Sequence, residues 1–216
     1  LEANMSFVPS STDKAQLADI SLFDHSKITA AVGNCIYEYM EEQGISSYKH
    51  ALFENAAEYY MKKCFLMFSM DISGIQDFIY TVHSEGALKM LRSKSFYLEM
   101  MLEHIIDILI DRIGVSRANL IYSGGGHAYM LLPATEKVKN LIDEFEKELN
   151  DWSIDNFRTA LYIACGYAEC SANDLRNEPD GSYKDIFMNV SRVLSAKKAS
   201  RYSAEQIIRL NDITAG

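Results

Sequence analysis

From residue 64 onward, the spacing of the hydrophobic residues alternates between strand-like and helix-like patterns in an order that few folds can accommodate. A short apolar run that ends at Asp71 predicts a buried strand, and two further runs that flank a glycine cluster predict a β-hairpin. The predicted elements are strands at 64–71, 118–122, 128–132 and 159–168, and helices at about 86–113, 133–152 and 182–202. Their order along the chain is therefore β-α-β-β-α-β-α.

This order predicts an α+β fold of the ferredoxin-like type. In that βαββαβ plan an antiparallel sheet carries its helices on one face, and strands that are distant in sequence lie side by side. The C-terminal end of the first strand then lies beside the tip of the hairpin. We therefore expect Asp71 to lie close to Gly124, Gly125 and Gly126, although about fifty residues separate them in sequence.

The N-terminal part of the chain has only helical patterns. Helical spacing begins at Ser21 and ends at Gly44, and a second helix is predicted at about 47–63. Because two helices have too few partners to close a core, residues 1–63 are interpreted as part of a helical domain preceding the sheet. The palm-like region then covers 64–181, and 182–216 form a helix and linker.

Composition places the chain among ordinary globular proteins. Its 216 residues are 48% hydrophobic and 24% charged, which excludes a disordered chain, and the net charge of −9 argues against a globally basic nucleic-acid-binding surface. We recognise no signal peptide, no membrane span and no CxxC pair among the four cysteines. We therefore expect reduced thiols and a cytoplasmic location, and the start at Leu1 indicates an excised fragment.

The first strand and the hairpin correspond to the part of a palm fold that handles nucleotides. Palm domains of polymerases and nucleotide cyclases hold two Mg²⁺ ions about 4 Å apart with carboxylates at these two places. Here Asp71 supplies one carboxylate, but 123–127 reads Ser-Gly-Gly-Gly-His, where an active cyclase has two acids. Because one carboxylate cannot hold two metals, we predict a palm that binds a nucleotide or pairs with another palm and does not catalyse unaided.

The candidate nucleotide-binding residues surround these two turns. Backbone N–H groups after Asp71 can cradle phosphates where the next helix begins, and glycines permit close approach of a ligand. The candidates are Asp71, Ile72, Ser73, Gly74, Ile75, Gln76, Ser123, Gly124, Gly125 and Gly126. The simpler alternatives are that Asp71 caps the following helix and that the glycines only permit a tight turn.

Two further features have both a structural and a functional interpretation. The pair Asp24–His25 stands at a helix start, where an acid is more often a cap than a metal ligand. The last predicted helix is basic and can contact a nucleic-acid backbone or pack against a partner domain. Its cationic residues are Lys184, Arg192, Lys197, Lys198 and Arg201.

Several long strings, in order along the chain, carry a family resemblance. They are Asp-Ile-Ser-Gly-Ile-Gln-Asp-Phe-Ile-Tyr at 71–80, Ala-Leu-Lys-Met-Leu-Arg-Ser-Lys-Ser-Phe-Tyr at 87–97 and Ala-Asn-Leu-Ile-Tyr-Ser-Gly-Gly-Gly-His at 118–127. These strings resemble the first palm domain of the large subunit of type III-A CRISPR (Csm) effector complexes. Residues 19–31 resemble the end of that subunit's HD nuclease domain, and 193–207 resemble the segment that leads to its zinc-binding domain.

The resemblance implies functions that the residues alone do not show. The family's large subunit cleaves single-stranded DNA at its HD site and, when target RNA is bound, converts ATP into cyclic oligoadenylates with a GGDD motif in the second palm. It implies that 64–181 form a degenerate GGDEF-like palm, which contributes half of a composite ATP and Mg²⁺ site, with Asp71 near the metal. It also implies that Asp24 and His25 can lie beside the metal ion of the HD nuclease site, such as Mg²⁺ or Mn²⁺.

The partners implied by the resemblance are the second palm, the other Csm subunits, crRNA, target RNA and single-stranded DNA, with no membrane. Because the chain lacks the start of the HD site, the zinc cysteines and the GGDD acids, we expect the isolated fragment to be inactive. The alternative hypothesis is a stand-alone degenerate cyclase-like module that binds a nucleotide or serves as a scaffold.

Overall fold

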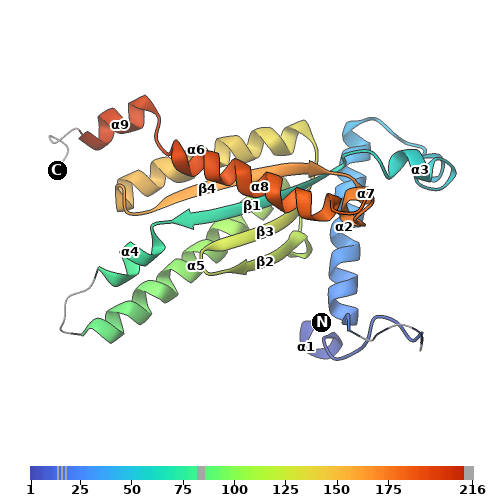
Figure 1. The fold of residues 1–216 in the computed structure, drawn as a ribbon, viewed down its shortest axis with the longest axis horizontal. Helices are drawn as coiled ribbons and strands as arrows, with labels where there is room; N and C mark the ends of the chain where they lie inside the picture. The colour runs from blue at the N-terminus through green and yellow to red at the C-terminus, as the bar shows by residue number, and fades with distance from the viewer. Residues whose placement is uncertain (14, 16, 18, 82–85, 212–216) are drawn as a thin grey trace.

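A single antiparallel sheet forms the centre of the molecule in the computed structural model, which describes residues 1–13, 15, 17, 19–81 and 86–211 (Figure 1). The central strand β1 pairs with β3 on one side and with β4 on the other, and the sheet order is β2-β3-β1-β4. This is the ferredoxin-like order, which confirms the predicted fold class. The strands are β1 (Phe65–Ser73), β2 (Leu120–Gly124), β3 (His127–Pro133) and β4 (Tyr162–Cys170).

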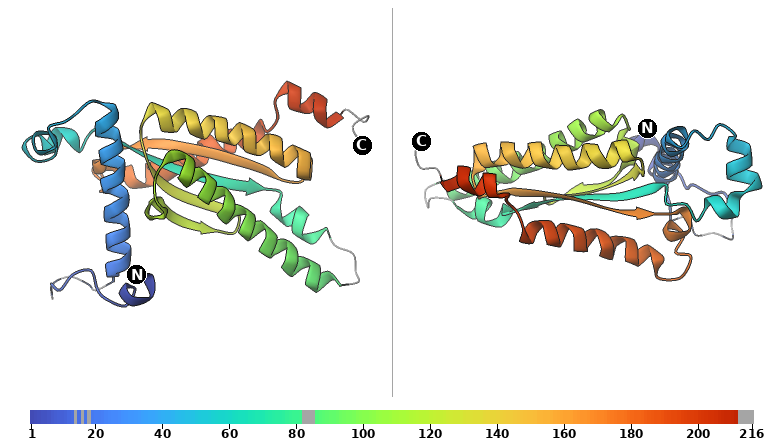
Figure 2. Two further views of the ribbon diagram at one scale, coloured as in Figure 1. Left: turned by 180° about the vertical axis from the view of Figure 1, so that it is seen from behind. Right: turned by 90° about the horizontal axis from the view of Figure 1, so that it is seen from above.

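Two long helices, α5 (Ala87–Ile113) and α6 (Glu136–Phe157), cover one face of the sheet (Figure 2). Alternate side chains of β1 point into this layer, where Leu66, Phe68 and Met70 are completely buried. These two helices are those of the βαββαβ plan, and they lie on one face as the sequence predicts.

The opposite face of the sheet is partly covered by α8 (Ser182–Ala199), which packs over β1 and β4 (Figure 2). Phe65 and Met67 of β1 point into this second core, where they meet Ile186 and Val190 of α8. A further helix, α9 (Ala204–Asn211), follows α8 and was not predicted from the sequence. The basic helix at the end of the chain is therefore packed against the sheet along much of its length.

Of the N-terminal helices, α2 (Leu22–Glu42) packs against the sheet. It follows a short α1 (Glu2–Met5), and its Cys35 and Met40 belong to the second core. The predicted continuous helix at 47–63 is wrong: a π-helical turn (His50–Glu54) is followed by α3 (Ala56–Tyr59). Asn55, which separates them, has non-helical backbone angles, and asparagine competes with helical hydrogen bonding through its own side chain.

The remaining elements are short. They are α4 (Ile75–Tyr80), a 3₁₀ turn (Arg117–Asn119) and α7 (Ala172–Leu175). Among the helices that the structure describes, none combines the length and the apolar character needed to cross a membrane.

All four cysteines are buried and unpaired. Cys165 belongs to the core beneath α5 and α6, and Cys170 to the core beneath α8, as their odd spacing in one strand predicts. Burial raises the pKa of the Cys64 and Cys170 thiols to about 12. These thiols are therefore packing groups and poor nucleophiles.

The turn after β1 generates a stability prediction. Gly74 has φ +91°, and a Cβ atom there would lie 2.0 Å from the carbonyl oxygen of Ala160. Gly74→Ala should therefore lower the free energy of unfolding by about 2 kcal/mol or more, measured by urea denaturation. Gly33→Ala is the control, because a Cβ atom there meets no neighbour within 4 Å and should stabilise α2 by up to about 1 kcal/mol. Equal unfolding midpoints for the two variants would contradict this account.

Candidate functional site at the glycine hairpin

The end of β1 and the β2–β3 hairpin lie side by side, as predicted. Asp71 is directly opposite His127 in the β1–β3 ladder, and the backbone N–H of Ile72 donates a hydrogen bond to the Gly126 carbonyl at 2.9 Å. The side chain of Ile72 is buried in the core, so only its backbone belongs to this region. Pairing between non-consecutive strands thus brings the two predicted segments together.

A pocket of about 320 Å³ lies against the hairpin on the side of α4 and α5. It closes under Gly126, where a Cβ atom would lie 1.9 Å from the Ile75 side chain, and it opens at Gly125, where a Cβ atom would meet nothing within 4 Å. Gly125 and Gly126 have φ +61° and +83°, which a tight turn alone explains, and the space above Gly125 is also open to a ligand. The lining residues are Ile75, Ile79, Ser95, Leu98, Glu99, Leu102, Glu103, Ser123, Gly124, Gly125 and Gly126.

Ser123 is already engaged within this pocket. Its hydroxyl donates a hydrogen bond to Glu103 at 2.6 Å, and Glu103 also pairs with Arg117. Two hydrogen bonds lower the pKa of Glu103. The bond from Ser123 has the larger effect and the bond from Arg117 the smaller one. Glu103 is therefore held as an ionised group at the wall of the pocket.

The residues after Asp71 lead into a short helix. Gly74 precedes α4, a helix of only six residues, and Ile75 reaches under the hairpin. Ser73 is half-buried at the end of β1, and Gln76 is exposed on the first turn of α4. Because this helix is so short, its N-terminal dipole is weak, and phosphate binding by these residues stays a prediction.

The carboxylate of Asp71 faces the other side of the sheet, toward α8. Its Oδ2 lies 2.8 Å from Lys198 Nζ and 3.1 Å from His127 Nδ1. Burial alone would raise the pKa of Asp71, but the hydrogen bonds from His127 and Lys198 and their charges together lower it. Asp71 does not cap the following helix, because Gly74 is the N-cap residue of α4. The sequence did not identify Lys198 as its partner.

Ser69, His127 and Asp71 form a chain of contacts in the order of a hydrolase triad. His127 Nε2 lies 3.0 Å from Ser69 Oγ, and the Ser69 hydroxyl donates a hydrogen bond to the Ala128 carbonyl at 3.0 Å. Ser69 is completely buried, so no substrate reaches its oxygen. These contacts therefore hold the side chains of His127 and Asp71 in place, and Ser69 does not serve as a nucleophile.

The surroundings of Asp71 do not fit a divalent cation. Mg²⁺ requires several oxygen ligands, whereas Asp71 contacts an ammonium group and an imidazole. Within the described part of the chain, no three His, Cys, Asp or Glu side chains are placed to share a metal ion. The ammonium group of Lys198 thus neutralises Asp71 in place of a metal ion.

Asp24 and His25 lie far from the hairpin, at the N-terminal end of α2, whose body packs at the opposite end of the sheet (Figure 1). The Ser21 side chain accepts a hydrogen bond from the Asp24 N–H at 3.0 Å and donates one to the Asp24 carboxylate at 2.7 Å. Asp24 therefore takes part in capping α2, which is the structural one of the two interpretations.

Comparisons with known proteins agree with this architecture. A family model described as "Csm1 subunit domain B" matches residues 64–213. A protein of Mycobacterium tuberculosis named "CRISPR system single-strand-specific deoxyribonuclease Cas10/Csm1 (subtype III-A)" is 52% identical over 98% of this chain and 27% of its own length. A protein of Enterococcus italicus with the same name is 48% identical over 97% of this chain and 28% of its own length.

Solved structures are similar as well. A Csm1–Csm4 cassette in complex with one ATP has a TM-score of 0.73 and 27% sequence identity, over 90% of this chain and 25% of its own. A cassette in complex with cA4 has a TM-score of 0.73 and 28% identity, over 90% of this chain and 25% of its own. This chain thus spans about a quarter of the length of the relatives that it matches.

The pairing of Asp71 with Lys198 predicts a pH effect. Lys198→Gln should raise the pKa of the Asp71 carboxyl, measured by NMR titration of its side-chain carbon, because the variant removes a cation and a charged donor. The ionised Asp71 contributes stability that is complete above its ordinary pKa of about 3.9 and is lost as pH falls through the lower folded value. The variant should lose part of this acid-dependent contribution. Lys184→Gln on the same helix is the control, and an unchanged Asp71 pKa in Lys198→Gln would refute the assignment.

Proposed function

The chain belongs to the Csm1 family of type III-A CRISPR systems, and on that premise we propose that it forms the first palm of such a large subunit and supplies half of a composite ATP site. The names of its relatives, which include single-strand-specific deoxyribonuclease, support an enzymatic parent protein. The cassettes solved with ATP and with cyclic or linear oligoadenylates support nucleotide binding by the family. Cleavage of single-stranded DNA and synthesis of cyclic oligoadenylates are the activities that we propose for the whole protein.

The pocket against the glycine hairpin is the observation that carries this proposal. Its volume of about 320 Å³ is at the lower end of what small-molecule sites enclose, as expected of one half of a shared site. Ser95 and Glu99 line the wall opposite the glycines. The adenine amino group is a hydrogen-bond donor, so the Glu99 carboxylate is a suitable acceptor for the base. The open backbone at Gly125 lets another part of the nucleotide approach.

Catalysis in this proposal depends on groups outside the chain. The hairpin carries no acid, and Asp71 is neutralised by Lys198 on the other face of the sheet. The divalent cation of the reaction is therefore assigned to acids of a second palm. The palm formed by this chain orients the nucleotide. Without that second palm, the isolated chain should bind ATP weakly and should not turn it over.

The other segments are assigned by the same membership. Residues 1–63 form the end of the HD nuclease domain, and 182–216 lead toward a zinc-binding domain. The partners that we propose are the remaining Csm subunits, crRNA, target RNA and single-stranded DNA. The structures of Csm1 with Csm4 support the first of these.

A substitution at the tip of the hairpin tests the nucleotide site. Gly125→Asn places a side chain in the open space above the hairpin, and asparagine tolerates the left-handed backbone that φ +61° requires. Affinity for ATP should fall about tenfold or more, which is the effect of losing about 1.4 kcal/mol of contacts. The measurement is calorimetric titration of ATP into the chain mixed with the second palm.

Gly44→Asn provides a matched control, because Gly44 has φ +65° and equally open surroundings after α2, away from the pocket. It should leave ATP binding unchanged. Binding that requires the second palm supports the composite site, whereas tight binding by the chain alone would identify a self-sufficient nucleotide module. Equal ATP affinity of the two variants would place the nucleotide away from the hairpin, and no binding in any mixture would leave a scaffold. Either result would overturn the proposal.

A further inference from the structure

The face of the sheet that carries α8 is only partly covered. The helix lies over β1 and β4, and it leaves β2 and β3 open beside it (Figure 1). A shallow groove of about 740 Å³ runs between β3 and the neighbouring flank of α8. Its lining combines three aromatic side chains with two cations, two serines and one methionine. This groove and the hairpin pocket have no lining residue in common, and the two lie on opposite faces of the sheet.

Aromatic rings form a continuous row across the groove. Tyr129 on β3 contacts Phe187 on α8 edge to face, with ring centroids 5.5 Å apart, and Phe187 contacts Tyr183 in the same way at 5.2 Å. Tyr122 on the edge strand β2 is directly opposite Tyr129 in the ladder, so it extends the row on the same face of the sheet. At the two ends of the row, Tyr122 and Tyr183 are 54% and 46% exposed. The row therefore presents aromatic surface to solvent.

The groove is cationic, although the chain as a whole has a net charge of −9. Lys184 and Arg192 line it, whereas Asp185, the single acid of α8, does not. Lys197 and Lys198, farther along the same helix, form ion pairs with acids of other elements. In the ranges that the structure describes, Lys184 and Arg192 form no such pair, and no acid is among the lining residues of the groove. The groove is therefore complementary to an anionic ligand, unlike the hairpin pocket, which is lined by two glutamates.

These groups together match the chemistry of a single strand of nucleic acid. Bases of any sequence stack on exposed aromatic rings, and cations beside the rings neutralise the phosphates. An acidic peptide would use the cations but would leave the aromatic row without a stacking partner. Ser191 and Ser195, about one helical turn apart on α8, add two hydroxyl groups to the wall. A ribose 2′-hydroxyl can exchange hydrogen bonds with them and deoxyribose cannot, which favours RNA over DNA.

We propose that the groove between β3 and α8 binds single-stranded RNA. About two or three bases stack along the row from Tyr122 to Tyr183, and the cations of the wall contact the phosphates. Other four-stranded sheets stack about two or three RNA bases on aromatic side chains, which is a parallel of architecture and not of ancestry. The inference rests on the proposed function for the presence of an RNA partner, and it assigns that partner a surface. It is independent of the ATP pocket, with which the groove shares no residue.

The probe is a fluorescently labelled oligouridylate of about ten nucleotides, a length within the site sizes of single-strand-binding proteins. Its fluorescence anisotropy should rise saturably with the concentration of the chain. The logarithm of affinity should fall with the logarithm of salt concentration with a slope of about −1.4, as expected for two phosphate contacts. Arg192→Gln should make this slope shallower by about 0.7, because it removes one contact. A deoxyuridine oligomer of the same length should bind at least about threefold more weakly.

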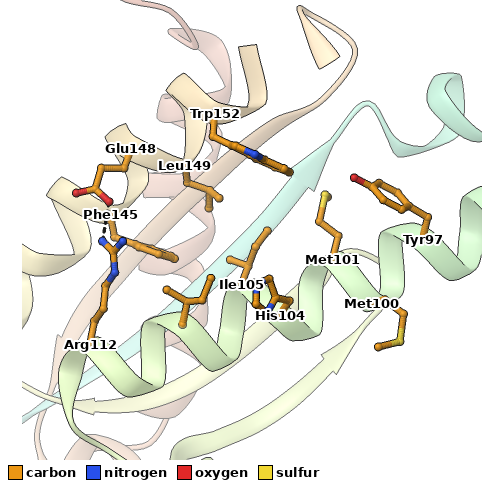
Figure 3. Close-up of a pocket in the computed structure, with 11 residues that line it drawn as sticks. Tyr97, Met100, Met101, His104, Ile105, Arg112, Phe145, Glu148, Leu149 and Trp152 are labelled. Carbon is orange, nitrogen blue, oxygen red and sulfur yellow. Dashed lines mark hydrogen bonds and ion pairs between the residues drawn. The ribbon is translucent and has the colours of Figure 1, made fainter. Parts of the chain in front are cut away.

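Tyr183→Leu tests the location, because it removes a ring and keeps an apolar side chain at an exposed position. RNA affinity should fall about fivefold or more, which is the lower range for the loss of one stacked base. The matched control is Tyr97→Leu. Tyr97 is also 46% exposed and also contacts a phenylalanine ring edge to face, but it lies in the groove between α5 and α6 on the opposite face of the sheet (Figure 3). This variant should bind RNA as the parent does.

The readouts separate this inference from the proposed nucleotide site. Tyr183→Leu should leave ATP binding in the mixture with the second palm unchanged, so a selective loss of RNA binding supports the groove. The inference is overturned, whether or not ATP binds, by the absence of saturable RNA binding or by equal losses in Tyr183→Leu and Tyr97→Leu. Equal affinity for the deoxyuridine oligomer, or for a polyglutamate peptide of similar length, would also overturn it.

Discussion

The two-residue alternation of the central strand β1 determines most of this structure. Because β1 pairs on both edges and is covered on both faces, its successive side chains must enter two different cores. Leu66, Phe68 and Met70 require α5 and α6, whereas Phe65 and Met67 require α2 and α8. A shift of one residue in the pairing would exchange these two sets, so the register is strongly specified.

The same alternation decides what the end of β1 can do. Asp71 has the parity of Phe65 and Met67, so its carboxylate points to the α8 face even though its backbone lies beside the glycine hairpin. A half-buried carboxylate on that face needs a counter-charge, and Lys198 at the end of α8 supplies it. The pocket lies on the other face. The Asp71 carboxylate and the pocket therefore lie on opposite faces of the sheet. In the proposed function, the chain can hold a nucleotide but has no free carboxylate beside it to bind a catalytic metal ion.

Much of this architecture follows from patterns that the sequence contains. Hydrophobic spacing predicts the βαββαβ order, the helix that begins at Ser21 and the meeting of Asp71 with the glycine hairpin, because local periodicity and strand pairing determine all three. The position of α8 could not be predicted, since an amphipathic helix packs equally well on a sheet or on a partner. The contact of Lys198 with Asp71 depends on that position, and charged residues on a helix do not reveal which of them find buried partners. The roles of the site residues stay predictions.

The central claim is that the glycine hairpin and the pocket beside it hold a nucleotide. The most direct measurement is an amide-resolved NMR titration of this chain with ATP, in the presence of the unlabelled second palm. The account predicts that the amide signals of Gly124, Gly125 and Gly126 and of the facing part of α5 move with one binding curve, while those of Lys184 and Arg192 on α8 stay in place. Movement confined to α8, or no movement at saturating ATP, would contradict it.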